Sequence, residues 1–171
     1  MYMVGQGVVH LSHGVGTIRG IETRDFGNGM VSFYIVEIVD NGSPKKVFVP
    51  TNNSTERLRP LVTQADFRKV IAYLSSKENP LADSIDYHGS GSWNRRYRAF
   101  MGDLHTGMPM RIAKVLKALD RLEVEKELSF GERMLKKQAL ELLSREFAAV
   151  NGEPQLHMEI KIATALGESY G

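Results

Sequence analysis

The sequence predicts an α+β fold in which a small β module is followed by an all-α domain of about five helices. Three observations support this prediction. Short β-rich runs separated by turn signals fill residues 1–62. From residue 63 onward, apolar residues recur at the spacing of helices instead. Glycine, proline and capping residues between these periodic segments indicate where one helix ends and the next begins.

The β module contains four β-rich runs, which are GVVHL, GVGTIRGIETR, MVSFYIVEIV and KKVFVP. The Asn-Gly pairs at 28–29 and 41–42 suit tight hairpin turns, because both central positions tolerate a positive φ. Alternation along the third run places Phe33, Ile35, Glu37 and Val39 on one face and Tyr34, Val36 and Ile38 on the other. Four or five short strands in about 60 residues are typical of a small, strongly bent sheet or a barrel.

The first two helices of the second domain are predicted from caps and periodicity. Thr63 suits an N-cap with Asp66 three residues later, and an apolar face follows at Phe67, Val70, Ile71 and Leu74. Residues 77–92 are expected to form a loop, because they are rich in Pro, Asn, Asp, Gly and Ser. Ser92 is expected to cap a second helix that runs to about His105.

The remaining three helices follow from breaks in the pattern. Gly107 and Pro109 separate the second helix from a third, whose apolar face is Ile112, Val115, Leu116 and Leu119. A capping box from Ser129 to Glu132 opens a long fourth helix, and the Asn-Gly pair at 151–152 ends it. Pro154 begins the last helix. The predicted domains are therefore residues 1–62 and 63–171.

Composition narrows the class of protein. The chain has 171 residues, of which 42% are hydrophobic and 25% charged, enough for one ordinary domain or two small ones. It has no cysteine, which excludes disulfides and thiolate metal sites and fits a reducing cytoplasm. No apolar run approaches the roughly 20 residues of a membrane span. The N-terminal residues have no basic start and no unbroken apolar core, so we expect a cytoplasmic protein without a signal peptide.

Positive charge is concentrated in one part of the sequence. The net charge of the whole chain is only +2. Residues 93–121 nevertheless carry seven basic side chains against two acidic ones, whereas residues 122–168 carry six against nine. Because a local basic surface matters more for nucleic acid than the bulk charge does, residues 93–121 are the candidate region for such a contact.

No pattern in the sequence indicates a catalytic site. His10 and His13 have no third ligand nearby, so we expect no metal site. The glycine-rich residues 5–16 precede a predicted strand, whereas a phosphate-binding loop precedes a helix N-terminus. The glutamates at 123, 125 and 127 are typical of a solvated face. We therefore expect no enzyme activity, no cofactor and no small-molecule substrate.

The segment GSGSWNRRYRAF, residues 89–100, holds the only tryptophan of the chain, Trp93. On a helix, Trp93 falls in one stripe with Tyr97, with Phe100 or Met101, and with Leu104. This spacing favours a core residue, because large aromatic side chains dominate burial.

Two features of the same segment favour an exposed role for Trp93. The residue falls in the first helical turn after a Gly-Ser run, and Arg95, Arg96 and Arg98 follow it without neighbouring acids to pair with. An aromatic ring beside arginines suits nucleic acid, where the ring wedges against a base step and the guanidinium groups hold phosphates. Protein partners also use tryptophan and arginine as anchors, so both kinds of partner remain open on these residues alone.

Several motifs resemble, in order and spacing, those of the CarD family of bacterial transcription regulators. They are VGQGVVHLSHGVGTIRGIETR, FYIVEI and VFVP, then SWNRRYRAFMGDLHTG, and then LSFGERMLKKQALELLSREFA, over about residues 4–150. The resemblance implies that the N-terminal module is the Tudor-like β-barrel shared with the transcription-repair coupling factor, which docks on the β subunit of RNA polymerase. It also implies that the helical domain faces DNA.

The resemblance implies roles for particular residues. Trp93 matches the tryptophan that wedges into the minor groove at the upstream edge of the promoter bubble and stabilises the open complex. The basic patch that contacts DNA, largely independently of its sequence, falls on Arg95 and Arg96, with Arg98 as an extension. Such a protein is located on the nucleoid through RNA polymerase.

The surface that contacts RNA polymerase in the family falls on the N-terminal module. The matching positions here are Arg24, Phe48 and Pro50. Some family members carry a basic residue where Phe48 stands. Arg24 is expected to lie on an exposed strand edge, which is a natural docking site by sheet augmentation.

Two other functions are compatible with the sequence. In the first, the chain is an adaptor on RNA polymerase whose helical domain binds another protein rather than DNA. Some divergent members of the group lack the tryptophan and basic motif, so its presence here favours DNA. The second, a free-standing architectural DNA binder, needs a larger basic surface than residues 93–121 supply.

Overall fold

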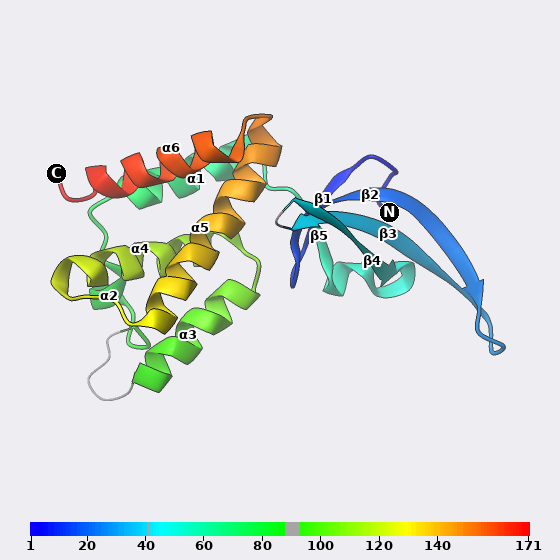
Figure 1. Cartoon of the computed structure of the whole chain (residues 1–171), viewed down its shortest axis with the longest axis horizontal. Helices are drawn as coiled ribbons and strands as arrows, with labels where there is room; N and C mark the ends of the chain where they lie inside the picture. Colours follow the sequence, from blue (N-terminus) through cyan, green and yellow to red (C-terminus); the bar gives the residue numbers. More distant parts are fainter. Residues whose placement is uncertain (41, 88–92) are drawn as a thin grey trace. The chain divides into compact units, whose positions relative to one another are not determined.

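The computed structural model describes residues 1–40, 42–87 and 93–171. The chain divides into two compact units, Met1–Leu61 and Val62–Gly171. The first unit contains the strands and the second contains the α-helices (Figure 1). Two predictions fall outside the described residues: the turn at Asn41 and the cap at Ser92.

The first unit is a five-stranded antiparallel sheet with the order β4-β3-β2-β1-β5. The strands are β1 (Gly7–His10), β2 (Gly14–Asp25), β3 (Met30–Asp40), β4 (Ser43–Pro50) and β5 (Leu58–Pro60), with the 3₁₀ helix η1 (Thr51–Glu56) before the last. Within the described residues β4 and β5 are the two ends of this order and do not pair with each other. The sheet is therefore open, and the expected Tudor-like barrel is not confirmed.

The predicted alternation along β3 is confirmed. Tyr34, Val36 and Ile38 are buried in a small core with residues from β1, β2, β4 and β5, whereas Phe33 and Ile35 point to the opposite, partly exposed face. A side chain at Gly16 of β2 would approach the Val36 Cγ1 atom to 2.7 Å and the Glu37 carbonyl oxygen to 2.9 Å. Glycine at this position therefore allows β2 to lie close to its neighbour β3.

The second unit contains the helices α1 (Gln64–Ser75), α2 (Pro80–Asp83), α3 (Trp93–His105), α4 (Pro109–Glu125), α5 (Phe130–Asn151) and α6 (Gln155–Glu168). The capping boxes predicted at Thr63 and Ser129 are both present. The helix α2 lies where a loop is expected, because the Asn79 side chain accepts a hydrogen bond from the Leu81 N–H and Pro80 occupies the first helical position. This Asn-Pro pair is a helix start signal that the composition of the segment obscured.

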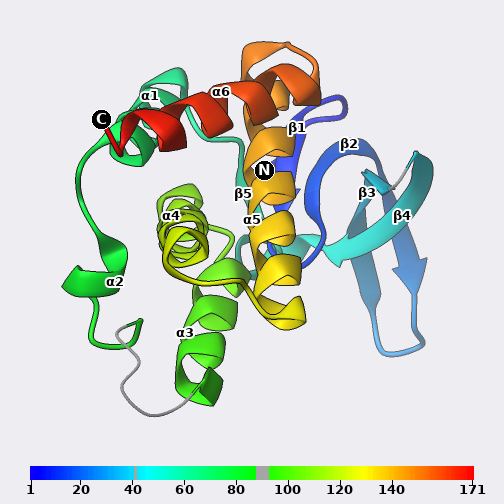
Figure 2. The ribbon, with the colours of Figure 1, turned by 60° about the vertical axis from the view of Figure 1, so that its left-hand side comes forward.

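The core of the second unit is built around α4, which contacts α1, α2, α3 and α5. Figure 2 shows α4 almost end-on, with these helices around it. Val115, Leu116, Ala118 and Leu119 of α4 are at most 1% exposed. α4 is thus buried over most of its circumference, and these four helices pack on it.

Candidate functional site

Helix α3 begins at Trp93, the residue on which the DNA-binding prediction depends. The side chain of Trp93 lies outside what the structure describes. Further along the helix the predicted stripe is confirmed, since Phe100 and Leu104 are buried and Tyr97 and Met101 pack against the same core. The apolar face of α3 therefore anchors the helix to the unit through its middle and C-terminal turns.

The expectation that the arginines of α3 lack acidic partners is wrong for two of the three. Arg95 is exposed, and its Nη2 atom lies 3.3 Å from Oδ1 of Asp86. Arg96 pairs with Glu132 of α5. Arg98 is exposed on α3. The partner of Arg96 lies 36 residues away in the sequence, so only the packing of α3 against α5 brings the two charges together.

Arg96 differs from its neighbours because its partner is buried. Its Nη2 atom donates a hydrogen bond of 2.9 Å to Oε1 of Glu132, and the two side chains are only 14% and 2% exposed. The other carboxylate oxygen of Glu132 accepts a 2.9 Å hydrogen bond from the Ser129 N–H, which closes the capping box of α5. Lys126 adds a second cation, with its Nζ atom 3.6 Å from Oε1.

These contacts keep Glu132 ionised. Burial by itself raises the pKa of the carboxyl, because a low dielectric disfavours the charged form. The hydrogen bonds from Ser129 and Arg96, together with the charges of Lys126 and Arg96, outweigh burial and hold the pKa of Glu132 below its ordinary value. At neutral pH the pair is therefore an arginine and a carboxylate, joined by a charge-assisted hydrogen bond.

Lys117 is a buried basic residue that the charge pattern assigned to the positive surface. Its side chain is fully buried, and its Nζ atom donates to the carbonyl oxygens of Tyr73 and Ser76 at 2.7 Å each and to the Ser76 hydroxyl at 2.9 Å. It therefore caps the C-terminal end of α1. The sequence contains one indication that Lys117 is buried: it stands between Leu116 and the apolar pair at 118–119.

The structure brings together Arg24 and Phe48, two of the residues predicted to contact RNA polymerase. The Arg24 guanidinium lies 4.8 Å from the centre of the Phe48 ring, and its Nε atom donates a hydrogen bond of 2.6 Å to Oε1 of Glu22. Pro50, two residues beyond Phe48 on β4, pairs across the sheet with Phe33. These side chains lie on the partly exposed face of the sheet, opposite the buried core.

Arg24 also belongs to an open strand edge. In the described residues β1 pairs with β2 only as far as Thr17, whereas β3 pairs with β2 out to Asp25. The two long strands β2 and β3 continue past β1 to a hairpin tip (Figure 1). Around this tip Ile21, Phe26 and Met30 are at least half exposed, an apolar surface that the sequence reasoning did not single out.

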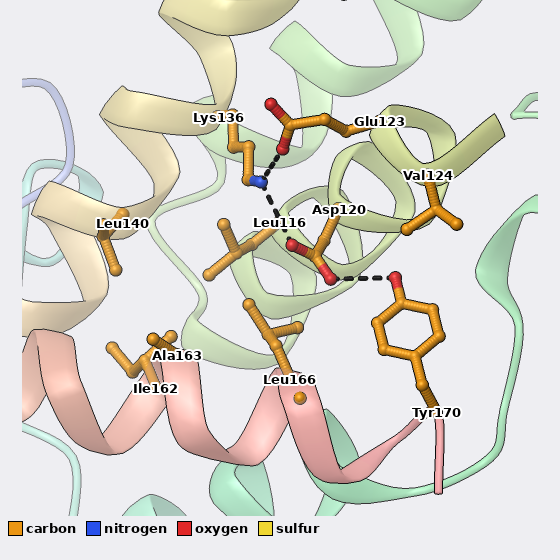
Figure 3. Close-up of a pocket in the computed structure, with 11 residues that line it drawn as sticks. Leu116, Asp120, Glu123, Val124, Lys136, Leu140, Ile162, Ala163, Leu166 and Tyr170 are labelled. Carbon is orange, nitrogen blue, oxygen red and sulfur yellow. Dashed lines mark hydrogen bonds and ion pairs between the residues drawn. The ribbon is translucent and has the colours of Figure 1, made fainter. Parts of the chain in front are cut away.

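A cavity of about 430 Å³ lies between α4, α5 and α6 (Figure 3). Its floor is apolar, with Leu116, Leu140 and Ile162. The polar groups at its rim satisfy one another, because Lys136 donates to Asp120 and Glu123, and the Tyr170 hydroxyl donates to Asp120 at 2.9 Å. The cavity thus offers no unpaired group for chemistry.

None of the helices described is long and apolar enough to cross a membrane. No group of three or more His, Asp or Glu side chains in the described part of the chain is placed to hold a metal ion.

Comparison with known proteins assigns both units to one family. Residues 2–62 match the family described as CarD-like/TRCF RID domain, and residues 69–163 match the family described as CarD, C-terminal domain. The chain is 26% identical over 156 residues to a Bacillus subtilis (strain 168) protein described as "Putative transcription factor YdeB", covering 89% of this chain and 94% of that protein. The chain belongs to the CarD family of transcription regulators.

Proposed function

We propose that the protein docks on the β subunit of RNA polymerase through its first unit and contacts promoter DNA through α3. In this function it stabilises the open promoter complex at the upstream edge of the bubble, with Trp93 as the wedge. The observation that carries the proposal is the placement of Trp93 at the start of α3, within about a turn and a half of the exposed Arg95 and Arg98. Membership of the CarD family, and similarity to a Bacillus protein described as a putative transcription factor, support a role in transcription.

The open edge of β2 and the outer face of the sheet are the surface we assign to RNA polymerase. Unpaired strand edges accept a further strand, which gives affinity through main-chain hydrogen bonds. Arg24 lies on β2 beside this edge, whereas Phe48 and Pro50 lie on β4 on the outer face. These three residues would supply specificity, with the Arg24 guanidinium already placed over the Phe48 ring. The half-exposed Phe26, whose ring centre lies 6.0 Å from that of Phe33 on the outer face, extends the same surface toward the hairpin tip.

The wedge acts by differential binding. A side chain that inserts at a base step stabilises the melted promoter only if it contacts that state better than the closed duplex. A coupling of about 1.4 kcal/mol is sufficient to shift the ratio of open to closed complex tenfold. Exposed arginines on α3 would hold the neighbouring phosphates and so fix the position of Trp93 on the DNA.

Docking on RNA polymerase explains why a modest basic surface is enough. A tether raises the local concentration of the helical unit at the promoter to about millimolar, so its intrinsic affinity for DNA can be weak. The net charge of +2 is consistent with this requirement. A free-standing DNA binder would instead depend on its own charge for affinity.

One experiment with two variants tests the proposal. Trp93→Ala is expected to retain RNA polymerase in a pull-down but to lose the increase in open-complex lifetime. Arg24→Glu is expected to lose both, because it reverses the charge at the docking surface and removes the contact with Phe48. Circular dichroism checks that each variant is folded.

Each variant serves as the control for the other. If Trp93→Ala unfolded the helical unit, Trp93 would be a core residue and the wedge would be wrong. If Arg24→Glu left the pull-down unchanged, the docking surface would be wrongly assigned. If the helical unit bound with little dependence on salt, the adaptor function would replace DNA binding, since phosphate contacts weaken steeply as salt rises.

A further inference from the structure

We propose that Arg96 is a positioning residue, which locks the first turn of α3 to the first turn of α5 through Glu132 and does not contact phosphate itself. The inference rests on the proposed function, because it concerns how α3 is presented to DNA. It separates the three arginines of α3 into two roles. Arg95 and Arg98 face outward to the polyanion, whereas Arg96 holds the helix that carries Trp93.

Burial is the first reason. The Arg96 side chain is 14% exposed, whereas that of Arg95 is 65% exposed. A phosphate contact requires the guanidinium to reach the surface of the duplex. Arg95 reaches solvent in its present position, but Arg96 would have to leave Glu132 to do so.

The cost of leaving Glu132 is the second reason. The carboxylate is 2% exposed and depends on Arg96 for its shortest side-chain hydrogen bond, at 2.9 Å. Without Arg96 it would keep the Ser129 N–H and the more distant Lys126, whose side chain is 47% exposed. A buried carboxylate that loses its main cation is strongly destabilised, so exchanging Glu132 for a phosphate is unfavourable.

The place of the pair in the fold is the third reason. Glu132 lies in the first turn of α5, where its second oxygen is fixed by the capping box. Arg96 lies one turn into α3, three residues after Trp93. Phe100 and Leu104 hold the later turns of α3 by apolar packing, and α3 also contacts α5. Figure 2 shows α3 below the first turns of α5. The ion pair therefore fixes the start of α3, where Trp93 and Arg95 lie.

A substitution of Glu132 tests the inference, because the two possible roles of Arg96 predict opposite changes in DNA affinity. Glu132→Gln removes a negative charge from a protein that binds a polyanion. If Arg96 were a phosphate contact restrained by Glu132, this change would release it and strengthen binding. If Arg96 positions α3, the same change loosens the first turn and weakens binding, although the protein becomes more positive.

The experiment uses the full chain and a promoter duplex with a pre-melted segment, and follows fluorescence anisotropy over a range of KCl concentrations. Arg98→Ala is the matched control for a phosphate contact and is expected to reduce the slope of log K against log salt by about 0.9. Arg96→Ala and Glu132→Gln are each expected to lower affinity at least about fivefold with the slope unchanged. The double variant Arg96→Ala/Glu132→Gln is expected to bind DNA no more weakly than either single variant, because each single substitution already breaks the same ion pair.

Thermal melting and circular dichroism confirm that the variants are folded. Glu132→Gln retains an oxygen that can accept from the Ser129 N–H, so it disturbs the cap of α5 less than an alanine would. Arg96→Gln with Glu132→Gln gives a second, neutral pair if Arg96→Ala does not fold. This double variant is expected to recover part of the affinity, since two amides can hydrogen-bond to each other.

The inference is overturned if Arg96→Ala reduces the salt slope as much as Arg98→Ala does, or if Glu132→Gln binds as well as the wild type or better. Failure of the proposed function gives a different result. In that case the wild-type chain neither binds the pre-melted duplex nor lengthens the life of the open complex with RNA polymerase.

Discussion

Arg96 and Lys117 are basic residues whose side chains add little to the exposed positive charge of the protein. Both belong to the stretch of the sequence with the highest excess of positive charge. Arg96 pairs with buried Glu132, and Lys117 donates to two carbonyl oxygens and a hydroxyl at the end of α1. The exposed positive surface is therefore smaller than the charge count of residues 93–121 suggests, and on α3 its exposed arginines are Arg95 and Arg98.

His10 is the residue through which pH is expected to change the stability of the first unit. It is 5% exposed, its Nδ1 atom accepts a 3.1 Å hydrogen bond from the Ser12 N–H, and its ring lies 4.6 Å from that of His13. Burial, and then the positive charges of His13 and Arg57, lower the pKa of His10 from 6.5 to about 4. The folded state therefore keeps His10 neutral where the unfolded state would protonate it.

The sign of the pH dependence follows from these two values. Stability from neutral His10 is fully present above pH 6.5 and is lost as the pH falls toward about 4, where the folded state also binds the proton. We expect urea unfolding of the first unit to show a loss of about 1–3 kcal/mol over this window. Tyrosine fluorescence of fragment 1–61, whose tyrosines are Tyr2 and Tyr34, follows the transition once circular dichroism has shown that the fragment is folded.

The control is His10→Gln, which keeps an acceptor for the Ser12 N–H but cannot titrate. Its unfolding free energy should change less between pH 7.5 and pH 5 than that of the wild type. Equal pH dependence in the two proteins would assign the effect to other groups and contradict the role given to His10.

At the scale of elements, helix ends decide how the second unit is held together. Capping boxes satisfy the N-termini of α1 and α5, and the Lys117 ammonium satisfies the C-terminus of α1 from α4. The ammonium also lies 4.7 Å from the centre of the Tyr73 ring. A positive charge at a helix C-terminus is favourable, and here it also joins two helices across the core.

Lys117→Met tests this cap. Methionine has a similar length but donates no hydrogen bond, so the carbonyls of Tyr73 and Ser76 would lose their buried partner. We expect a loss of roughly 2–4 kcal/mol in the unfolding free energy of the second unit, measured by urea denaturation. Lys114→Met, at an exposed position of the same helix, is the control and should change stability by less than about 0.5 kcal/mol. Equal effects of the two substitutions would show that the cap contributes nothing.

At the scale of the whole molecule, the two units are separate cores on one chain. In the proposed function the first unit binds RNA polymerase and the second contacts DNA, so their covalent connection is what raises local concentration at the promoter. Neither unit alone should then stabilise the open complex.

Separated units test this requirement. Fragments 1–61 and 62–171, mixed at micromolar concentration, are expected not to lengthen the life of the open complex, whereas the intact chain does so at the same concentration. Circular dichroism of each fragment establishes that it is folded. Full activity from the mixed fragments would show that the connection is dispensable and would contradict the tethering mechanism.

Local features of the sequence determined the types of most elements and the start of several helices. The Thr63 and Ser129 caps act within one turn, and the alternation from Phe33 to Ile38 acts within one strand, so nearby residues suffice to predict them. The motifs in their order also identified the family. The short helix α2 was missed because its single Asn-Pro signal lies in a segment with the composition of a loop.

Contacts between elements decided whether the sheet is open and which partners the charged side chains have. Openness of the sheet depends on whether β4 meets β5, and the pairing of Arg24 with Phe48 depends on the register of three strands. The partners of Arg96 and Lys117 lie 36 and more than 40 residues away in the chain. A charge count adds side chains without regard to distance or solvent, whereas burial and pairing set what each charge can reach. For this reason the sequence alone identified a basic helix with a tryptophan at its start, and only the tertiary structure separated the arginines that face outward from the one that holds the helix in place.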